Sequence, residues 1–373
     1  MRPQLRQTLA TVGLVLVLVV AGGALLLLPR LTDTSSSQPT GTPSGTPSAS
    51  PGPATGLPAP GTDAFDELLA NAPTPAALKR TMGRRGMRQV SGPPPAHDLA
   101  VRVATFNLLG ASHTIGPHRR KNYAVGIQRV PGQVAMLESK GVTVAGFQEF
   151  QRSQVQRFRE VTRGQWALHP GMSQGPWLAE NSVGWRKDTW QPVETHIIDI
   201  PYFAGHPRGM AYALLQHRQT GHRIWIANFH NPANIGGDFA RFRAQAVQIE
   251  VALAKRLRAT GIPVVFTGDM NDRSAFACPF TAGSGMHSAD GTHTDAKGRC
   301  RTASRLEIDW ILGSRQVTFS QFEVDNSSRG QRLTDHPLIT ATATLPAARN
   351  ASKCTVRAST KGYLWFCPRK NAG

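Results

Sequence analysis

The chain has 373 residues, enough for one large domain or two ordinary ones, and its 40% hydrophobic and 17% charged residues suit a globular core with some low-charge segments. The formal charge of +19 favours a polyanionic partner, such as nucleic acid or anionic lipid, but carries no information about the fold. No GxGxxG turn between a strand and a helix is present, which argues against a Rossmann-type nucleotide binder.

Residues 1–31 predict a basic cytoplasmic start followed by a membrane anchor. Arg2 and Arg6 precede an uncharged apolar run, residues 11–28, whose length is close to that of a bilayer-spanning helix. A cleaved signal peptide has a shorter core and a small-residue cleavage site, and no convincing site follows Leu28. We therefore expect an uncleaved anchor with its amino terminus inside and the rest of the chain outside the cytoplasm. A cleaved signal peptide is the alternative.

The residues after the anchor divide into a stalk, a lead-in segment, a catalytic domain and a tail. Residues 32–62 are rich in Ser, Thr, Pro and Gly and almost uncharged, which predicts a disordered stalk. Residues 63–98 predict short helical pieces or an exposed arm with a basic end. Residues 99–346 alternate strand and helix patterns, and residues 347–373 form a basic tail.

The alternation in the third segment favours an α/β fold in which helices cover packed sheets. Apolar runs predict strands within residues 98–109, 142–150, 181–190, 262–272, 305–314 and 333–345, and a hairpin within 208–231 that turns at 219–222. Apolar residues at helical spacing predict helices within 125–141 and 236–261, the first with a proline at position 131.

Four cysteines fit an exported chain with two disulfides, for which three connectivities are open. Their order favours Cys278 with Cys300 and Cys354 with Cys367. A structural zinc site needs closely paired Cys or Cys and His residues, and that spacing is missing.

Polar residues recur where the predicted strands end. Each of these residues has an ordinary structural explanation, such as a turn or a helix start, except Asp309. An Asp between Ile and Trp in a strand should be buried and need a partner. Together they supply the oxygen and nitrogen groups that handle a hard divalent cation and a phosphate. These residues are Asn107, Glu149, His230, Asp269, Asp309 and Asp335.

In order along the chain, six motifs resemble those of the endonuclease/exonuclease/phosphatase superfamily, which includes pancreatic deoxyribonuclease and bacterial sphingomyelinases. The resemblance covers residues 99–345 and comprises VATFNLLG, VAGFQEF, IANFHNP, FTGDMND, RLEIDWIL and LTDHPLITATA. It implies a four-layer α/β sandwich, in which two packed β-sheets are flanked by helices. It also implies hydrolysis of a phosphoester with Mg²⁺ or Mn²⁺ as cofactor.

For the metal, the resemblance implies Glu149 as the main carboxylate ligand, with Asn107 and Asp335 completing the site directly or through water. It does not extend to the loops that fix the substrate in the nucleases, the 5-phosphatases or the sphingomyelinases, and His113 has no counterpart in the family. Three residues are candidates for contacts to the substrate: Asn181, Arg208 and Tyr212.

For catalysis, the resemblance implies that Asp269 orients and deprotonates the attacking water, while Asn271 holds the phosphate or that water. His336 would contact the phosphate and be held by Asp309, and His230 would stabilise the developing charge or protonate the leaving group. Two residues apart on an extended segment, Asp269 and Asn271 should project to the same side.

The sequence therefore predicts an exported, membrane-anchored, metal-dependent phosphodiesterase, most simply an endonuclease that acts on nucleic acid as a monomer. A phospholipid or sphingomyelin phosphodiesterase is the alternative among enzymes, although no exposed apolar hairpin is evident in the sequence. A tethered binding protein without turnover is the alternative of another class.

Overall fold

The structure is a computed structural model that describes residues 57–90, 92–348 and 351–369. The anchor expected at residues 1–31 and most of the stalk expected at 32–62 lie outside the described residues. Within the described ranges, no helix combines the length and the apolar character that a membrane crossing requires.

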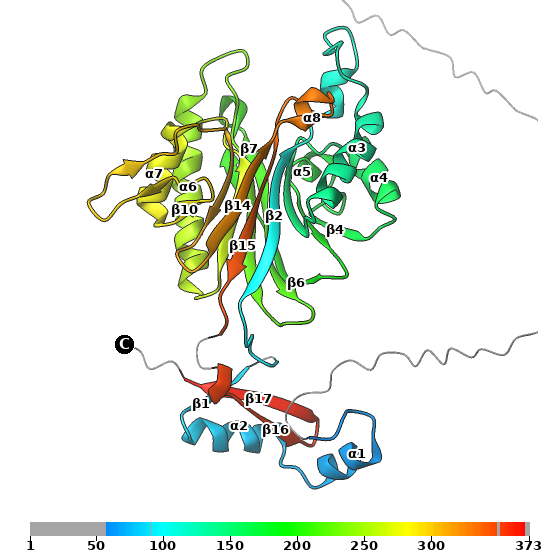
Figure 1. Cartoon of the computed structure of the whole chain (residues 1–373), viewed down its shortest axis with the longest axis vertical. Helices are drawn as coiled ribbons and strands as arrows, with labels where there is room; N and C mark the ends of the chain where they lie inside the picture. The colour runs from blue at the N-terminus through cyan, green and yellow to red at the C-terminus, as the bar shows by residue number, and fades with distance from the viewer. Residues whose placement is uncertain (1–56, 91, 349–350, 370–373) are drawn as a thin grey trace, which may run out of the picture. The chain divides into compact units, whose positions relative to one another are not determined.

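Two six-stranded mixed sheets form the centre of the larger domain (Figure 1). The first has the order β10 (His287–Ser288), β13 (Asp309–Gly313), β9 (Val264–Asp269), β8 (Arg223–His230), β7 (Pro207–His217) and β6 (Trp190–Pro201). The second has the order β14 (Thr318–Asp325), β15 (Leu338–Leu345), β2 (Leu99–Asn107), β3 (Val144–Gln148), β5 (Val183–Arg186) and β4 (Trp166–His169). In each sheet one pair is parallel, β8 with β9 and β2 with β3.

Helices cover the outer faces of both sheets. They are α3 (Gly126–Ser139), α4 (Arg152–Val161), α6 (Ala240–Ala259) and α7 (Ser274–Ser284). The short helices α5 (Pro176–Ala179) and α8 (Ser327–Gly330) and the 3₁₀ turns η1 (Ala111–Thr114) and η2 (Phe203–Gly205) belong to the connections between these elements and the strands. In Figure 1, α6 and α7 lie on the side of the first sheet, and α3 and α4 lie on the side of the second. A small hairpin of β11 (His293–Thr294) and β12 (Cys300–Arg301) follows α7.

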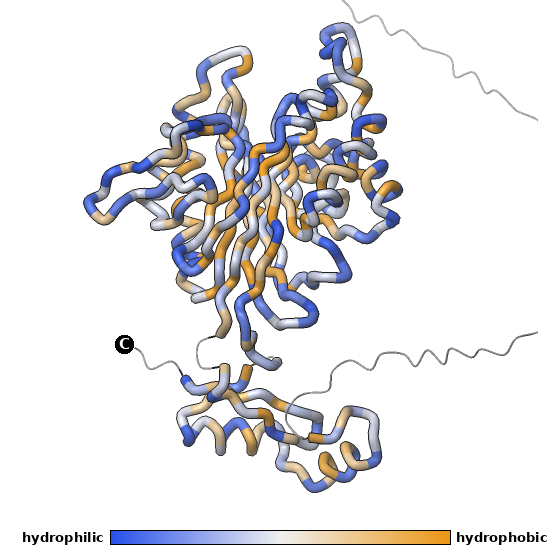
Figure 2. Tube along the Cα trace, viewed as in Figure 1, coloured by the Kyte–Doolittle hydropathy of each residue, from blue (hydrophilic) through white to orange (hydrophobic). Residues whose placement is uncertain are grey.

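Three apolar clusters fill the spaces between these four layers. One combines residues of both sheets, such as Val103 and Val265, and forms the inner core. A second joins the outer face of the first sheet to α6 and α7, and a third joins the second sheet to α3 and α4. The strands are correspondingly the most hydrophobic segments in Figure 2, while the loops at the upper end are mainly hydrophilic. This arrangement is the four-layer sandwich that the sequence predicts.

A buried polar contact joins the two sheets directly beneath the strand ends. Gln148 Nε2 on β3 donates to Asn228 Oδ1 on β8 at 2.5 Å, and Thr267 Oγ1 donates to the same oxygen at 3.3 Å. Gly146 makes this approach possible, because a Cβ there would lie 2.0 Å from Thr267 Oγ1 and 2.3 Å from Asn228 Oδ1. Packing and polar contacts thus hold the ends of β3, β8 and β9 close together.

Segments from before and after the sandwich form a separate small module. It consists of α1 (Asp63–Ala70), α2 (Pro75–Arg84), β1 (Met87–Val90), the 3₁₀ turn η3 (Ala351–Lys353), β16 (Thr355–Ser359) and β17 (Gly362–Pro368). Its sheet has the order β1-β17-β16, and Leu78 and Met82 of α2 pack on Phe366. The sequence treats residues 63–98 and 347–373 as independent segments, whereas the structure pairs them in one antiparallel sheet.

Most of the predicted elements are present, with some differences in extent. The helix predicted within 125–141 continues through Pro131, and the hairpin of β7 and β8 turns where predicted. Both predicted disulfides are present, Cys278–Cys300 and Cys354–Cys367. The sequence did not predict β14 or α4, because their apolar residues are too few to show a clear period.

Candidate active site

The register of the sheets brings most of the predicted site residues together at the strand ends that form the upper end of the sandwich in Figure 1. In the first sheet, Asp269 at the end of β9 pairs with His230 of β8 on one side and with Asp309 of β13 on the other. In the second sheet, Asn107 at the end of β2 pairs with Gln148, the residue before Glu149. The paired residues of the first sheet and those of the second sheet therefore lie at the same edge of the sandwich.

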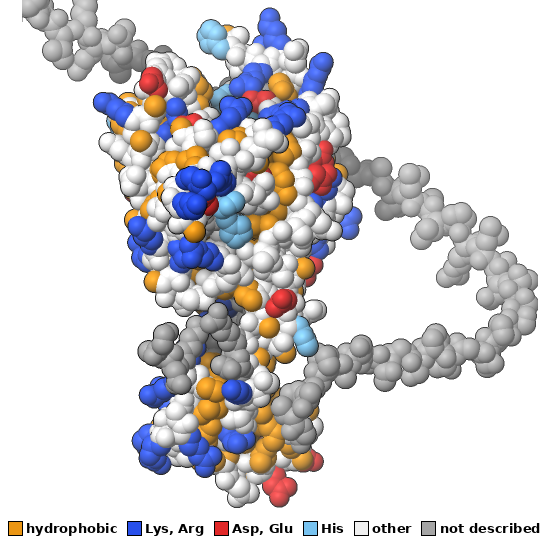
Figure 3. All heavy atoms as spheres, turned by 60° about the vertical axis from the view of Figure 1, so that its left-hand side comes forward, with side chains coloured by type: hydrophobic (Ala, Val, Ile, Leu, Met, Phe, Trp, Pro, Cys, Tyr) orange, Lys and Arg blue, Asp and Glu red, His pale blue; other side chains and the backbone are white. Residues whose placement is uncertain are grey.

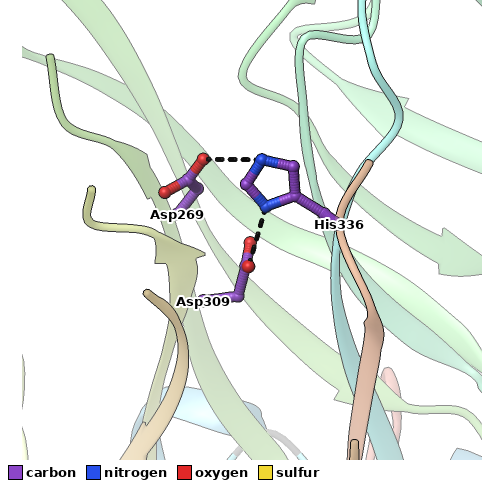
Figure 4. Close-up of side chains that lie close together, drawn as sticks. All are labelled: Asp269, Asp309 and His336. Atoms are coloured by element: carbon purple, nitrogen blue, oxygen red, sulfur yellow. Dashed lines mark hydrogen bonds and ion pairs between the residues drawn. The ribbon is translucent and has the colours of Figure 1, made fainter. Parts of the chain in front are cut away.

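His336 lies between two carboxylates of the first sheet, as Figure 4 shows. Its Nδ1 donates to Asp309 Oδ2 at 2.8 Å, and its Nε2 lies 3.7 Å from Asp269 Oδ2. Asp309 is buried, so this imidazole provides the partner that a carboxylate inside a strand requires.

The pKa values in this group are strongly displaced. Burial by itself lowers the pKa of His336, but the charges of Asp309 and Asp269 outweigh it and raise that pKa to about 10. Burial and the neighbouring Asp309 raise the pKa of Asp269, against the opposing effect of His336 and His230. At neutral pH, His336 is therefore an imidazolium ion that can contact a phosphate oxygen, and Asp269 is a stronger base than an exposed carboxylate.

Glu149 directly follows β3 and accepts hydrogen bonds from two different elements. Its Oε1 accepts from Asn107 Nδ2 at 3.1 Å, and its Oε2 accepts from the backbone N–H of Gly110 at 2.7 Å. His113 Nε2 lies 3.1 Å from the same Oε2. Burial raises the pKa of Glu149, but the hydrogen bond with His113 and the charge of His230 outweigh it, so the net pKa is well below its usual range.

Asn107 links the two carboxylates that matter most to the predicted chemistry. Its Nδ2 donates to Glu149 Oε1 and to Asp269 Oδ2, both at 3.1 Å, while its Oδ1 accepts from the backbone N–H of Leu109 at 3.0 Å. One amide thus sets the separation of Glu149 from Asp269. With Oδ1 already in use, this geometry favours an indirect contribution of Asn107 to a metal site.

His230 faces the same carboxylate from β8. Its Nε2 lies 3.6 Å from Asp269 Oδ2, and its Nδ1 hydrogen-bonds with the hydroxyl of Tyr202 at 3.4 Å. Burial lowers the pKa of His230, although Asp269 and Glu149 oppose the change. A neutral imidazole held by a tyrosine can donate one N–H hydrogen bond to the negative charge that develops on a leaving oxygen.

The loop after β9 differs from the expected extended segment. Asn271 has a φ of 49°, in the left-handed region, and its Nδ2 donates to the backbone oxygen of Asn231 at 2.8 Å. The prediction that Asp269 and Asn271 project together from an extended chain is therefore wrong. The chain turns here because the backbone N–H of Asn271 donates to Asp269 Oδ1 at 2.9 Å, which closes a local Asx turn.

Left-handed backbone conformations recur at this edge. Besides Asn271, both Leu109 and Glu149 have positive φ, at 53° and 56°. The buried Arg129 stabilises the turn at Leu109, since its guanidinium donates to the backbone oxygens of Leu108 and Leu109. Such conformations cost free energy and are found where the surrounding structure fixes the geometry of a functional site.

Asp335, predicted as a metal ligand, contacts a basic residue. Its Oδ2 forms an ion pair with Arg120 of the loop that follows η1. Among the described residues, the grouping of three or more acidic, His or Cys donors that could hold an ion is Asp269, Asp309 and His336, whose donor atoms lie within 4.8 Å of one another. Glu149 and Asp335 do not belong to that grouping. The carboxylates of the grouping and the carboxylate of Glu149 are both of the kind that binds a hard divalent cation.

The three residues predicted to contact substrate are placed differently from one another. Arg208 forms an ion pair with Glu180 and lies over the ring of Tyr202 at 5.6 Å, beside the His230 imidazole. Asn181 is buried and donates to the backbone oxygen of Gly209 at 3.4 Å.

Tyr212 is not brought to the site. Its hydroxyl accepts from Arg256 at 3.3 Å, and its ring stacks on His196, because on β7 it faces the helix side of the sheet. Tyr202 is the tyrosine that contacts the site. The sequence offered no signal for it, since it follows β6 in a segment without a motif.

Two packed mixed sheets bring carboxylates, histidines and amides together at one edge, and this set of groups suits the hydrolysis of a phosphoester. The model of the Endonuclease/Exonuclease/phosphatase family matches residues 104–336, more than half of the chain. The chain therefore belongs to this family, whose members hydrolyse phosphoesters and generally depend on a divalent metal ion.

Solved structures with the same fold share little sequence with the chain. A family protein from Bacteroides thetaiotaomicron is 17% identical with a TM-score of 0.53, and the match covers 66% of this chain and 98% of that one. A mannosyl-6-phosphatase from the same organism is 17% identical with a TM-score of 0.50, covering 65% and 99%. The human Nocturnin catalytic domain with bound sulfate is 14% identical with a TM-score of 0.50, covering 69% and 96%. No curated protein sequence matches the chain.

Proposed function

We propose that the chain is an exported, membrane-anchored phosphodiesterase that cleaves nucleic acid internally with the help of Mg²⁺ or Mn²⁺. The observation that carries this proposal is the double hydrogen bond of Asn107, at 3.1 Å to Glu149 and 3.1 Å to Asp269. It places a carboxylate suited to a metal ion beside a carboxylate suited to activating water, one from each sheet.

Each side chain has a role that its surroundings support. Asp269 accepts a proton from the attacking water, and its raised pKa makes it an effective base. The His336 imidazolium contacts a non-bridging phosphate oxygen, with Asp309 fixing its orientation. His230, which is hydrogen-bonded to Tyr202, donates a hydrogen bond to the charge that develops on the leaving oxygen. A divalent cation held by Glu149 would supply charge neutralisation at the phosphate.

Charge supports nucleic acid as the substrate. The face drawn in Figure 3 carries many Lys and Arg side chains and few Asp or Glu. Every described Lys and Arg of the small module is exposed, and none forms an ion pair within the described residues: Lys79, Arg80, Arg84, Arg85, Arg88, Lys353, Arg357, Lys361 and Arg369. Basic side chains without carboxylate partners attract the phosphate backbone.

Export and anchoring rest on different features. The apolar run at residues 11–28 has nearly the length of a membrane span, and two disulfides suit an oxidising compartment. Cell fractionation with sequencing of the mature amino terminus tests both. A chain that begins after residue 28 and appears in the medium would refute the anchor.

The function is tested with the full chain purified in detergent and incubated with supercoiled plasmid DNA. Nicking should require Mg²⁺ or Mn²⁺, stop with EDTA and fall strongly in Asp269→Ala. The matched control is Asp188→Ala, an exposed carboxylate at the turn between β5 and β6, which should retain full activity. Intact plasmid under all metal conditions would contradict the nuclease assignment.

One observation favours the lipid alternative. The three most exposed large hydrophobic side chains of the described residues are Trp177 at 72%, Ile235 at 64% and Ile115 at 58%. Ile115 directly follows η1 and Ile235 lies on the loop after β8, whereas Trp177 lies on the short helix α5, with its ring centroid 5.7 Å from the Arg208 guanidinium. Exposed apolar side chains of this kind can enter a lipid surface. Phosphocholine release from sphingomyelin vesicles, lost in Trp177→Ala while DNA remains intact, would replace nucleic acid by lipid as the substrate. Metal-dependent turnover of either substrate excludes a binding protein without activity.

A further inference from the structure

His113 is the residue that the family pattern leaves unexplained, and the structure places it at the proposed metal site. It lies on η1, which follows the short loop after β2, and its side chain is 40% exposed. Its Nε2 lies 3.1 Å from Glu149 Oε2. The imidazole therefore points toward Glu149 while part of it remains open to solvent.

The turn that carries His113 is held by side chains from the segment that follows Glu149. Gln151 Oε1 accepts from the backbone N–H of Ser112 at 2.8 Å, and Gln154 Oε1 accepts from that of Ala111 at 3.0 Å. Gln151 Nε2 also donates to Ser112 Oγ at 3.0 Å. These contacts tie the turn to the start of α4. The same stretch of chain thus supplies Glu149 and fixes the position of His113, as expected for a preorganised site.

The separation of the two groups fits shared coordination of one ion. In an octahedral site with metal–donor distances of about 2.1 Å, neighbouring donors lie about 3.0 Å apart. The observed 3.1 Å between His113 Nε2 and Glu149 Oε2 matches that edge. A direct hydrogen bond between His113 and Glu149 has a similar length. A spectroscopic measurement that detects the ligands of the bound ion is therefore needed to distinguish a hydrogen bond from shared coordination.

We propose that His113 and Glu149 are two ligands of one divalent cation, and that the imidazole gives the site a preference for first-row transition ions over Mg²⁺. Imidazole nitrogen binds such ions well, whereas Mg²⁺ selects oxygen ligands. This inference rests on the proposed function for the presence of a metal ion. It goes further in naming a nitrogen ligand and the class of ion.

The test is pulsed electron paramagnetic resonance of the full chain loaded with Mn²⁺, which detects ¹⁴N of a directly bound imidazole. The wild-type chain should show this coupling, and His113→Ala should lose it. We also expect Mn²⁺ affinity in His113→Ala to fall by about 10–100-fold, with a smaller change for Mg²⁺. His118→Ala, an exposed histidine further along the same loop, is the matched control and should behave as wild type.

Several outcomes would overturn the proposal. Nitrogen coupling that persists in His113→Ala but disappears in His336→Ala would place the ion at Asp269, Asp309 and His336 instead. Absence of coupling in the wild-type chain with Mn²⁺ bound would reduce His113 to a hydrogen-bond donor. His113→Gln guards against a folding defect, since its amide can still donate to Glu149 but contributes no imidazole nitrogen.

The same measurements separate this inference from the proposed function. Coupling that depends on His113, in a chain that cleaves neither DNA nor RNA, would support the ligand assignment and contradict the nuclease. Nicking of plasmid DNA without any nitrogen coupling would support the nuclease and contradict the assignment of His113 as a ligand.

Discussion

In the sandwich, Asp269 and Asp309 are buried, His336 is partly buried, and each contacts another ionisable group. The described Lys and Arg side chains of the small module are all exposed and without ion pairs. Burial amplifies charge interactions at short range, so the first group can displace pKa values and activate water. Exposed charges act over longer distances and are screened by salt, which suits attraction of a polymer. This difference supports the proposal that the sandwich performs the chemistry and the small module attracts a polyanionic substrate.

The largest effect is expected where a buried charge is removed. Asp269→Ala should lower kcat for phosphodiester cleavage by about 100-fold or more, because it removes the base that activates water. The measurement is steady-state cleavage of a fluorogenic DNA substrate, with the thermal unfolding curve as a check on the fold. Activity within a few fold of wild type would mean that the buried group does not perform the chemistry.

A second change tests how closely the sheets approach beneath the site. Gly146→Ala should lower the free energy of unfolding by about 3 kcal/mol, because its Cβ would lie 2.0 Å from Thr267 Oγ1. Chemical denaturation monitored by circular dichroism measures the change. Gly330→Ala, where an added Cβ meets nothing within 4 Å, is the matched control and should remain close to wild type.

A third change tests burial of charge away from the chemistry. Glu250 on α6 is fully buried, and burial raises the pKa of its carboxyl to about 8 against a small opposing contribution from Asn231. Below the pKa that Glu250 has in the unfolded chain, the carboxyl is protonated in both states, and its burial does not make the stability depend on pH. As pH rises from about 4.5 to 8, the unfolded state ionises first and stability falls.

Glu250→Gln should remove most of this pH dependence. We expect the stability of the variant relative to wild type to increase by about 3 kcal/mol from pH 5 to pH 8, which a comparison of the two Tm values at each pH would measure. Equal Tm differences at the two pH values would show that Glu250 is ionised in the folded chain.

The smallest effect is expected in the small module. Replacing Arg84, Arg85 and Arg88 by Gln should raise KM for DNA several-fold and leave kcat unchanged. It should also reduce the slope of log KM against log salt by up to about one unit for each phosphate that the variant no longer neutralises. Arg157→Gln and Arg186→Gln in the sandwich, both already in ion pairs, form the control. An unchanged KM would show that the module's charges do not bind the substrate.

Local sequence is enough to identify most of the side chains that take part in the site. Asn107, Glu149, Asp269 and Asp309 stand next to apolar strand runs, and this pattern of an apolar run bounded by a polar residue is visible without a fold. The disulfide order and the long helix α6 were likewise local features.

How these side chains meet depends on the tertiary structure. Placing β9 between β8 and β13 puts His230, Asp269 and Asp309 in one row, and strand order is a long-range property that no segment contains. The contact of Tyr202 with His230 and the left-handed turn at Asn271 also arise from packing of distant segments. The small module joins segments from before and after the sandwich, so its sheet could not be predicted from either segment alone.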